Sequence, residues 1–131
     1  MSRLIVRTRL DTFEAEIDGS DISNAIWLSL PFTATTNMLG SEIYFEMPLD
    51  VSMAGDLVTV LEAGDIAYWP KARALCIFFG PTPLSGEDGR PVSPYPVIRI
   101  GKVLGELSRL EDAGDRSRIV LERAFRSPDH G

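Results

Sequence analysis

The stretch Ala74-Leu75-Cys76-Ile77-Phe78-Phe79 decides the fold. It is apolar throughout, and a short unbroken apolar run is typical of a strand that is covered on both faces. We therefore predict that this strand forms the centre of the core. Just before it, Ile66-Ala67-Tyr68-Trp69 is also prone to form a strand, and Pro70-Lys71-Ala72-Arg73 connects the two.

A further strand is predicted upstream, at Glu42-Ile43-Tyr44-Phe45-Glu46-Met47. Successive side chains of a strand point to opposite faces, so Glu42, Tyr44 and Glu46 share one face and the apolar residues share the other. This strand therefore presents a polar and aromatic face.

The remaining segments indicate more strands and two short helices. Ser20 or Asp21 can cap a helix over residues 21–30 that Pro31 ends, and Gly114 can close a second helix over residues 105–112. Alternating or β-prone segments predict strands at residues 4–10, 13–17, 32–38, 57–61, 97–103 and 117–125.

About eight short strands and two short helices make the fold mainly β. Closing a small sheet removes its exposed edges, so we predict a closed eight-stranded β-barrel capped by two short α-helices. A β-sandwich is the alternative, because the number of strands does not separate the two.

Residues 80–96 contain five prolines and three glycines. Neither a strand nor a helix is expected at that spacing, so we predict a long loop. Long loops in compact domains are often functional, and a surface excursion without a role is the alternative.

Length and charge restrict the classes of protein to consider. The chain has 131 residues and a formal net charge of −6, which fits one domain over residues 1–125 followed by a polar tail at 126–131. An acidic chain without a basic cluster is not expected to bind nucleic acid. No segment is apolar enough to predict a membrane span, and the lone cysteine favours a cytoplasmic location.

Catalytic and metal-binding patterns are missing from the sequence. The single histidine, His130, lies in the polar tail, and the single cysteine, Cys76, lies in an apolar run without a cationic neighbour. These positions exclude a serine or cysteine nucleophile activated by histidine, and also a histidine-based zinc site. Without a phosphate-binding glycine loop or metal-ligand spacing, we predict no catalytic residue, no metal and no cofactor.

Three strings resemble those of an uncharacterised family of small bacterial and archaeal proteins with a cyclophilin-like fold. They are Gly40-Ser41-Glu42-Ile43-Tyr44-Phe45, Gly64-Asp65-Ile66-Ala67-Tyr68-Trp69-Pro70 and Ala74-Leu75-Cys76-Ile77-Phe78-Phe79-Gly80-Pro81-Thr82-Pro83. The pattern of elements fits this family from about residue 3 to residue 125. The resemblance implies a closed eight-stranded barrel with two helices, and it does not imply an activity.

Prolyl isomerisation is the activity that the fold family suggests. In true cyclophilins an arginine in a Phe-His-Arg string stabilises the twisted amide, beside a Gln-Gly-Gly-Asp string, and this sequence has neither string. Arg73 or Arg99 would have to replace the missing guanidinium, although an arginine on a strand is usually a solvated surface residue. Whether the chain is an enzyme therefore stays open.

Aromatic and acidic residues suggest a ligand site. Tyrosine and tryptophan offer flat apolar rings with polar tips, and Tyr68 and Trp69 are adjacent, so only one of them can face inward. Glu42 and Glu46 suit an acid–base pair or a hard cation, or else are solvated charges. The candidate ligand-binding residues are Asn37, Glu42, Tyr44, Glu46, Tyr68, Trp69, Phe78, Phe79, Tyr95 and Arg99.

The sequence thus predicts a barrel that binds a small molecule or a short peptide at its mouth, through recognition rather than bond-making. Prolyl isomerisation at a non-standard site is one alternative. A non-catalytic assembly subunit that docks through the loop at 80–96 is another, and a homodimer fits the composition without being required by it. Aromatic side chains that open onto a cavity favour the first interpretation, and a subunit contact at the same place favours the assembly role.

Overall fold

The central strand is the apolar run from which the prediction started. The computed structural model describes residues 2–124, so the predicted tail at 126–131, with His130, lies outside the described residues. Strand β8 (Ala74–Phe78) is buried along its whole length and pairs with β5 (Glu42–Glu46) on one side and β7 (Asp65–Trp69) on the other. This confirms a strand that is covered on both faces.

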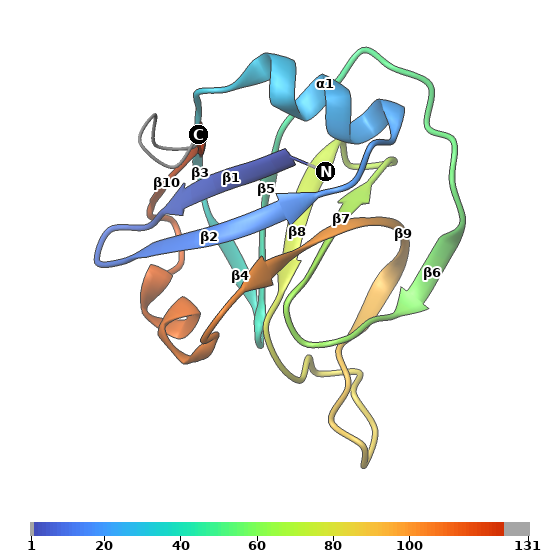
Figure 1. The fold of residues 1–131 in the computed structure, drawn as a ribbon. Coiled ribbons are helices and arrows are strands. Elements are labelled where there is room, and N and C mark those ends of the chain that lie inside the picture. The colour runs from blue at the N-terminus through green and yellow to red at the C-terminus, as the bar shows by residue number, and fades with distance from the viewer. Residues whose placement is uncertain (1, 125–131) are drawn as a thin grey trace.

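Ten strands form one antiparallel sheet (Figure 1). The remaining strands are β1 (Ser2–Arg7), β2 (Thr12–Ile17), β3 (Phe32–Thr35), β4 (Asn37–Leu39), β6 (Leu57–Val60), β9 (Val92–Leu104) and β10 (Arg118–Arg123). Their order is β3-β10-β1-β2-β9-β7-β8-β5-β4, with β6 paired to β9 beside this path. The fold is therefore mainly β, as predicted.

The sheet that residues 2–124 form is not closed, so the predicted closed barrel of eight strands is not what the structure contains. The predicted strand at 32–38 breaks at Thr36, whose hydroxyl donates to the Gly114 carbonyl at 2.6 Å and whose N–H donates to the Ser117 carbonyl at 2.7 Å. Before this break β3 pairs with β10, and after it β4 pairs with β5. One extended segment thus supplies both edges of the sheet.

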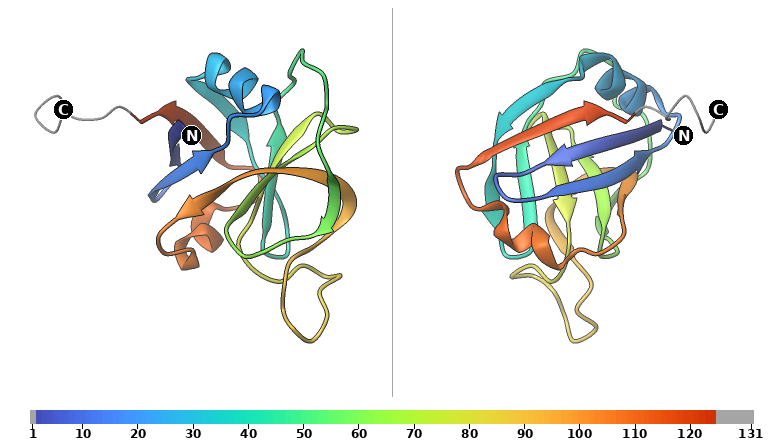
Figure 2. Two further views of the ribbon diagram at one scale, coloured as in Figure 1. Left: turned by 45° about the vertical axis from the view of Figure 1, so that its right-hand side comes forward. Right: turned by 60° about the vertical axis from the view of Figure 1, so that its left-hand side comes forward.

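The curvature of the sheet encloses the main core. Strands β10, β1 and β2 lie across from β5, β7 and β8, and the two helices lie at opposite ends of the space between them (Figure 2). Helix α1 (Asp21–Ser29) buries Ile22 and Ile26, and its Ser20 cap accepts from the Ser23 N–H at 3.2 Å. Across residues 2–124, no helix is long and apolar enough to cross a membrane.

The second helix differs from the predicted α-helix over 105–112. It is a 3₁₀ helix, η1 (Ser108–Ala113), which buries Leu110 and Ala113 and ends before Gly114 at φ 81°. A 3₁₀ turn of this length suits the short connection between β9 and β10.

The proline-rich segment is also different from the prediction, because β9 begins at Val92 and includes Pro94 and Pro96. Proline cannot donate to a sheet ladder, but it is tolerated where its nitrogen faces away from a partner strand, and both rings are exposed. The preceding residues 80–91 project from the body as the loop that the sequence predicted (Figure 1).

Two strands, β6 and β2, pair with the same edge of β9 at different residues. Ile98 pairs with Leu57 of β6, Gly101 pairs with Ile17 of β2, and β7 pairs with the opposite edge. Strands β6 and β2 therefore part at Arg99–Ile100. We call this parting the fork.

Gly101 permits the close approach of β2 to β9, which gives a first prediction. A Cβ atom at Gly101 would lie 2.1 Å from the Glu16 carbonyl oxygen and 3.0 Å from the Ile17 Cα, so Gly101→Ala must push the two strands apart. We expect the free energy of unfolding, measured with urea, to fall by about 2–4 kcal/mol. Gly19→Ala is the matched control, because a Cβ there meets nothing within 4 Å; an equal effect of both substitutions would contradict the steric explanation.

Candidate functional site

The outer face of the central strands carries a second, smaller apolar cluster. Alternate residues of β7, β8 and β9 point away from the main core, and Tyr44, Val58 and Trp69 pack around them. We call this group the outer cluster; its buried members are Leu61, Ala67, Cys76, Phe78 and Val97. Of the predicted ligand-binding residues, Phe78 lies fully buried in this cluster and cannot touch a ligand without rearrangement.

Three aromatic rings, those of Tyr44, Trp69 and Tyr95, lie together on the outer cluster and form what we call the aromatic surface. The Trp69 and Tyr95 rings stack with centroids 3.6 Å apart and planes at 8°, and Tyr44 meets the edge of Trp69 at 6.0 Å. All three side chains are partly buried. The sequence had predicted these residues at the mouth of a barrel, and the structure brings them together on the outer face of the sheet instead.

Glu42 is a fully buried carboxyl group beside the aromatic surface. Its exposed fraction is 0%, and among residues 2–124 its carboxylate oxygens have no hydrogen-bond partner other than the weak donor of the neighbouring Cys76 thiol. Burial raises the pKa of this carboxyl group from 4.5 to about 7, and the neighbouring Cys76 thiol lowers it only in part. Glu42 can therefore gain or lose a proton near neutral pH.

The Cys76 thiol is buried as predicted and is kept protonated by its surroundings. Burial first, and then the neighbouring Glu42, raise the pKa of this thiol well above its usual value. A thiol, unlike a thiolate, is a poor nucleophile, so the side chain packs in the outer cluster without reactive character.

Two predicted aromatic residues belong to the main core and not to the site. Tyr68 points inward from β7, and its hydroxyl donates to the Met47 carbonyl at 2.8 Å. Phe79 also packs in the main core. Tyr68 and Trp69 thus face opposite sides of the sheet, as the alternation of a strand requires.

Glu46 and Asn37 are separated from Glu42. Glu46 is exposed and lines a hollow of about 360 Å³ with Asn37 and Arg116, so the two glutamates do not act on one group. Asn37 has structural contacts: its amide donates to the Tyr44 carbonyl at 3.3 Å and its oxygen accepts from Arg116 at 2.8 Å. The interpretation as a solvated charge fits the exposed Glu46 and is wrong for Glu42, whose side chain is fully buried.

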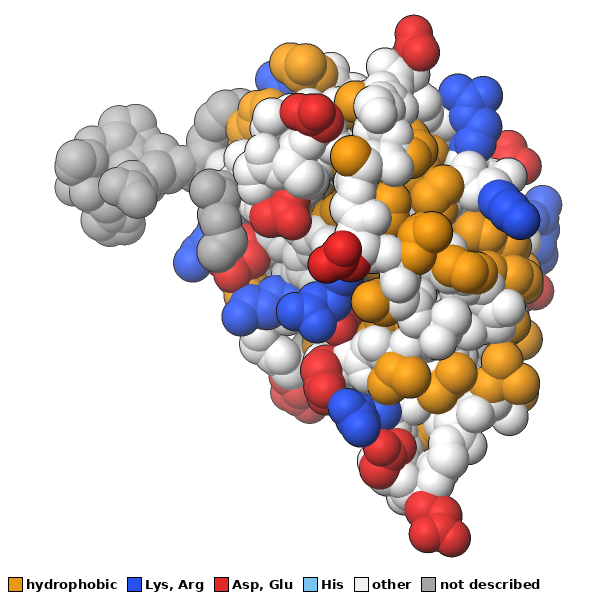
Figure 3. All heavy atoms as spheres, turned by 90° about the vertical axis from the view of Figure 1, so that its right-hand side faces the viewer, with side chains coloured by type: hydrophobic (Ala, Val, Ile, Leu, Met, Phe, Trp, Pro, Cys, Tyr) orange, Lys and Arg blue, Asp and Glu red, His pale blue; other side chains and the backbone are white. Residues whose placement is uncertain are grey.

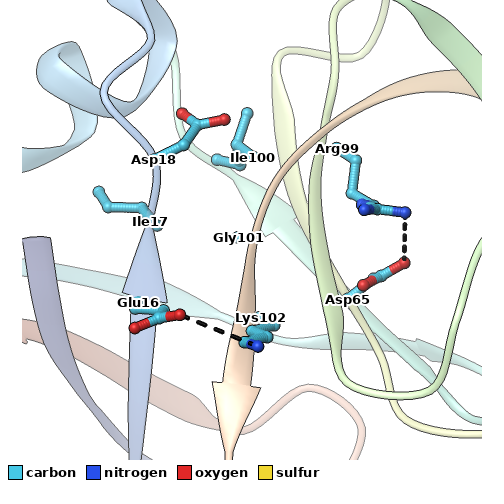
Figure 4. A pocket seen from close by; sticks show the side chains of 8 residues that line it. All are labelled: Glu16, Ile17, Asp18, Asp65, Arg99, Ile100, Gly101 and Lys102. Atoms are coloured by element: carbon cyan, nitrogen blue, oxygen red, sulfur yellow. Dashed lines mark ion pairs between the residues drawn. The ribbon is translucent and has the colours of Figure 1, made fainter. Parts of the chain in front are cut away.

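Arg99 lies at the fork, where sequence reasoning missed a charged groove. A hollow of about 310 Å³ contains Arg99 with Asp65 at 3.7 Å and Lys102 with Glu16 at 3.9 Å, and Asp18 flanks the opening (Figure 4). Hydrogen bonds from Ser20 and Ser23 outweigh the effect of burial and hold the pKa of Asp18 below its usual value. No pattern in the sequence indicates this groove, because it depends on where β6 and β2 part.

Metal ligation is not supported by the described part of the chain. Residues 2–124 contain no group of three or more His, Cys, Asp or Glu side chains arranged to hold a metal ion. At the fork, Asp65 and Glu16 pair instead with Arg99 and Lys102.

Comparisons with known proteins confirm the resemblance. The sequence matches the family described as Cyclophilin-like over residues 2–122. The solution structure of the hypothetical protein AF2241 from Archaeoglobus fulgidus is similar, with a TM-score of 0.77 and 35% sequence identity over 94% of this chain and 95% of that chain. No curated protein matches the sequence.

The raised pKa of Glu42 predicts a pH dependence of stability. From about pH 4.5 to about pH 7 the carboxyl group ionises in the unfolded chain but stays protonated in the folded one, so stability falls as the pH rises through this window. The loss is roughly 3 kcal/mol above pH 7. Glu42→Gln stays neutral, so we expect it to be more stable than the native chain at pH 8 and similar to it at pH 4.5.

Urea unfolding at pH 4.5, 6 and 8 measures this difference. Glu46→Gln is the control, because Glu46 is exposed on the same strand and its substitution should leave the pH dependence unchanged. A stability difference between native chain and Glu42→Gln that is the same at all three pH values would show that Glu42 ionises normally.

Proposed function

This chain belongs to the Cyclophilin-like family, and we propose that it acts by recognition and binds a small molecule or a short peptide at the aromatic surface. The observation that carries the proposal is the association of three partly exposed rings with a buried acid. Rings with this exposure contribute large contact areas to binding at a small cost in side-chain entropy. Their partial exposure leaves part of each ring open to a ligand, unlike the fully buried Phe78 and Phe45.

The chemistry of the surroundings favours binding over bond-making. The Cys76 thiol is held protonated, and the Glu42 carboxyl is sealed beneath neighbouring side chains. A flat or apolar group, such as an aromatic ring, an amide plane or a proline ring, suits the faces of Tyr44, Trp69 and Tyr95. The ligand therefore makes its main contacts with the aromatic surface.

Nuclear magnetic resonance of the two tryptophans tests the proposal. The chain contains only Trp27 and Trp69, and Trp27 packs below the Arg123 guanidinium, away from the aromatic surface. In a screen of aromatic fragments and short proline-containing peptides, we expect binders to shift the Trp69 indole N–H resonance and leave that of Trp27 in place. Trp69→Ala should abolish the binding.

Two other results would overturn the proposal. Ligands that shift neither indole at millimolar concentration would show that the aromatic surface binds nothing of these classes. A Trp69 shift that depends on protein concentration and needs no ligand would identify the surface as a contact between subunits, which is the assembly role.

Prolyl isomerisation has weaker support. Arg99 follows Tyr95 on the same face of β9 by four residues, which is about 13 Å along a strand, and its guanidinium is already paired with Asp65. The Arg73 guanidinium lies 3.4 Å from the Leu49 carbonyl. We therefore expect no acceleration in a protease-coupled assay at micromolar protein; acceleration that Arg99→Ala removes would instead establish the enzyme.

A further inference from the structure

We propose that Glu42 is the anchor of this binding site, and that its ligand carries a protonated amine or amidine that reaches the carboxylate from beneath the ring of Tyr95. The inference rests on the proposed function, because it names the chemical class of ligand for the same surface. It is carried by the unpartnered carboxyl group, the rings around it, and the way in which Tyr95 is held.

The carboxyl group of Glu42 lacks the partners that a buried acid needs. An ionised carboxylate offers about four acceptor positions, and leaving them empty in an apolar environment costs several kcal/mol. The titratable groups around Glu42 are Cys76 from β8, Tyr44 two residues along the same face of its own strand, and Tyr95 from β9. None of these carries a positive charge, so a ligand with cationic N–H donors would supply both the hydrogen bonds and the countercharge.

The rings beside Glu42 suit the same class of ligand. The π faces of tryptophan and tyrosine attract organic cations, most strongly where water is excluded. Burial first, and then Tyr44, Glu42 and Cys76, raise the pKa of the Tyr95 hydroxyl. Tyr95 stacks on Trp69, and Tyr44, which shares a face of β5 with Glu42, meets the edge of the same indole. A cationic head group at this point would meet a carboxylate on one side and aromatic faces on the others.

Access to Glu42 depends on the segment that carries Tyr95. Between the pairs that Val92 and Val97 make with β6, the four residues Ser93–Pro96 lie opposite the single residue Thr59. The two prolines of this bulge cannot donate to the ladder. Tyr95 is held by local bonds to the Ser93 hydroxyl, which accepts from its N–H at 3.1 Å and donates to its carbonyl at 2.6 Å.

This segment can therefore move with little loss of sheet hydrogen bonding. Displacing the segment would break the Tyr95–Trp69 stack, and a ligand ring or methylene group can then replace Tyr95 on the indole face. Figure 3 views the molecule from the side of β6, and hydrophobic side chains gather on this face. Leu57 and Val60 of β6 are both exposed.

Benzamidine and benzamide are matched probes for the test, because they have the same shape and differ in charge. We expect benzamidine at pH 8 to shift the Trp69 indole resonance, to leave that of Trp27 unchanged, and to bind roughly tenfold more tightly than benzamide. Glu42→Gln should remove this preference for the cation, and Glu46→Gln should retain it. Amide spectra of both variants show whether they remain folded.

The proton on Glu42 gives a second readout. Because its pKa is about 7 and benzamidine needs the ionised form, binding at pH 5.5 should be roughly 30-fold weaker than at pH 8. The raised pKa values of the Cys76 thiol and the Tyr95 hydroxyl keep both groups neutral over this range, so they do not contribute to the change.

The outcomes separate this inference from the proposed function. Equal binding of benzamide and benzamidine at Trp69, unaffected by Glu42→Gln, would overturn the role of Glu42 and leave the aromatic surface as the binding site. No shift of Trp69 with benzamidine would overturn the inference as well, and the fragment and peptide screen would still decide the proposed function. Benzamidine binding that shifts Trp27 or persists in Trp69→Ala would place the cation elsewhere and also overturn it.

Discussion

Antiparallel pairing along β9 ties the two faces of the molecule together, because its 13 residues bond to β2, β6 and β7. The C-terminal part contributes Ile100 and Val103 to the main core, and Gly101 lets β2 approach it closely. The N-terminal part brings Tyr95 against Trp69 and, with β6, covers the outer cluster. Where β6 and β2 part, Arg99 opens onto the charged groove at the fork. The charged groove therefore arises where β9 changes partners, and the aromatic surface where its N-terminal part meets Trp69 of β7.

The buried carboxyl group of Glu42 destabilises the folded chain, and the packing of the outer cluster does not require it. A leucine or methionine in place of Glu42 would fill similar space without an unpartnered carboxyl group, and buried polar groups are usually hydrogen-bonded. Residues that weaken the folded state in this way are typical of functional sites, where stability is given up for binding or catalysis. Neutral pH also places Glu42 near its midpoint, so a small change in its surroundings alters its charge.

Local patterns predicted the elements, and long-range pairing decided the rest. The apolar run at 74–79 marks the central strand, and the alternation of β5 and β7 separates Tyr44 and Trp69 from the main core. The prediction of a closed barrel was wrong. Hydrogen bonds from Thr36 to residues 114 and 117 divide one predicted strand into the two edge strands of the sheet. The predicted start of this strand, at Val97, was wrong, because an exposed edge tolerates prolines and β9 already begins at Val92. The burial of Glu42 was missed because alternation gives the face of a strand, but not what covers that face.

The charge of the chain and the chemistry of the site favour the same ligand. A net charge of −6 raises the concentration of cations near the surface and speeds their encounter with it. That attraction is screened over about 8 Å at physiological ionic strength, so it cannot select among cations. Selection must come from groups at contact distance, where Glu42 supplies the countercharge and the three rings exclude water and fit an apolar body. Long-range attraction and short-range recognition thus depend on different residues, but both favour a positively charged ligand.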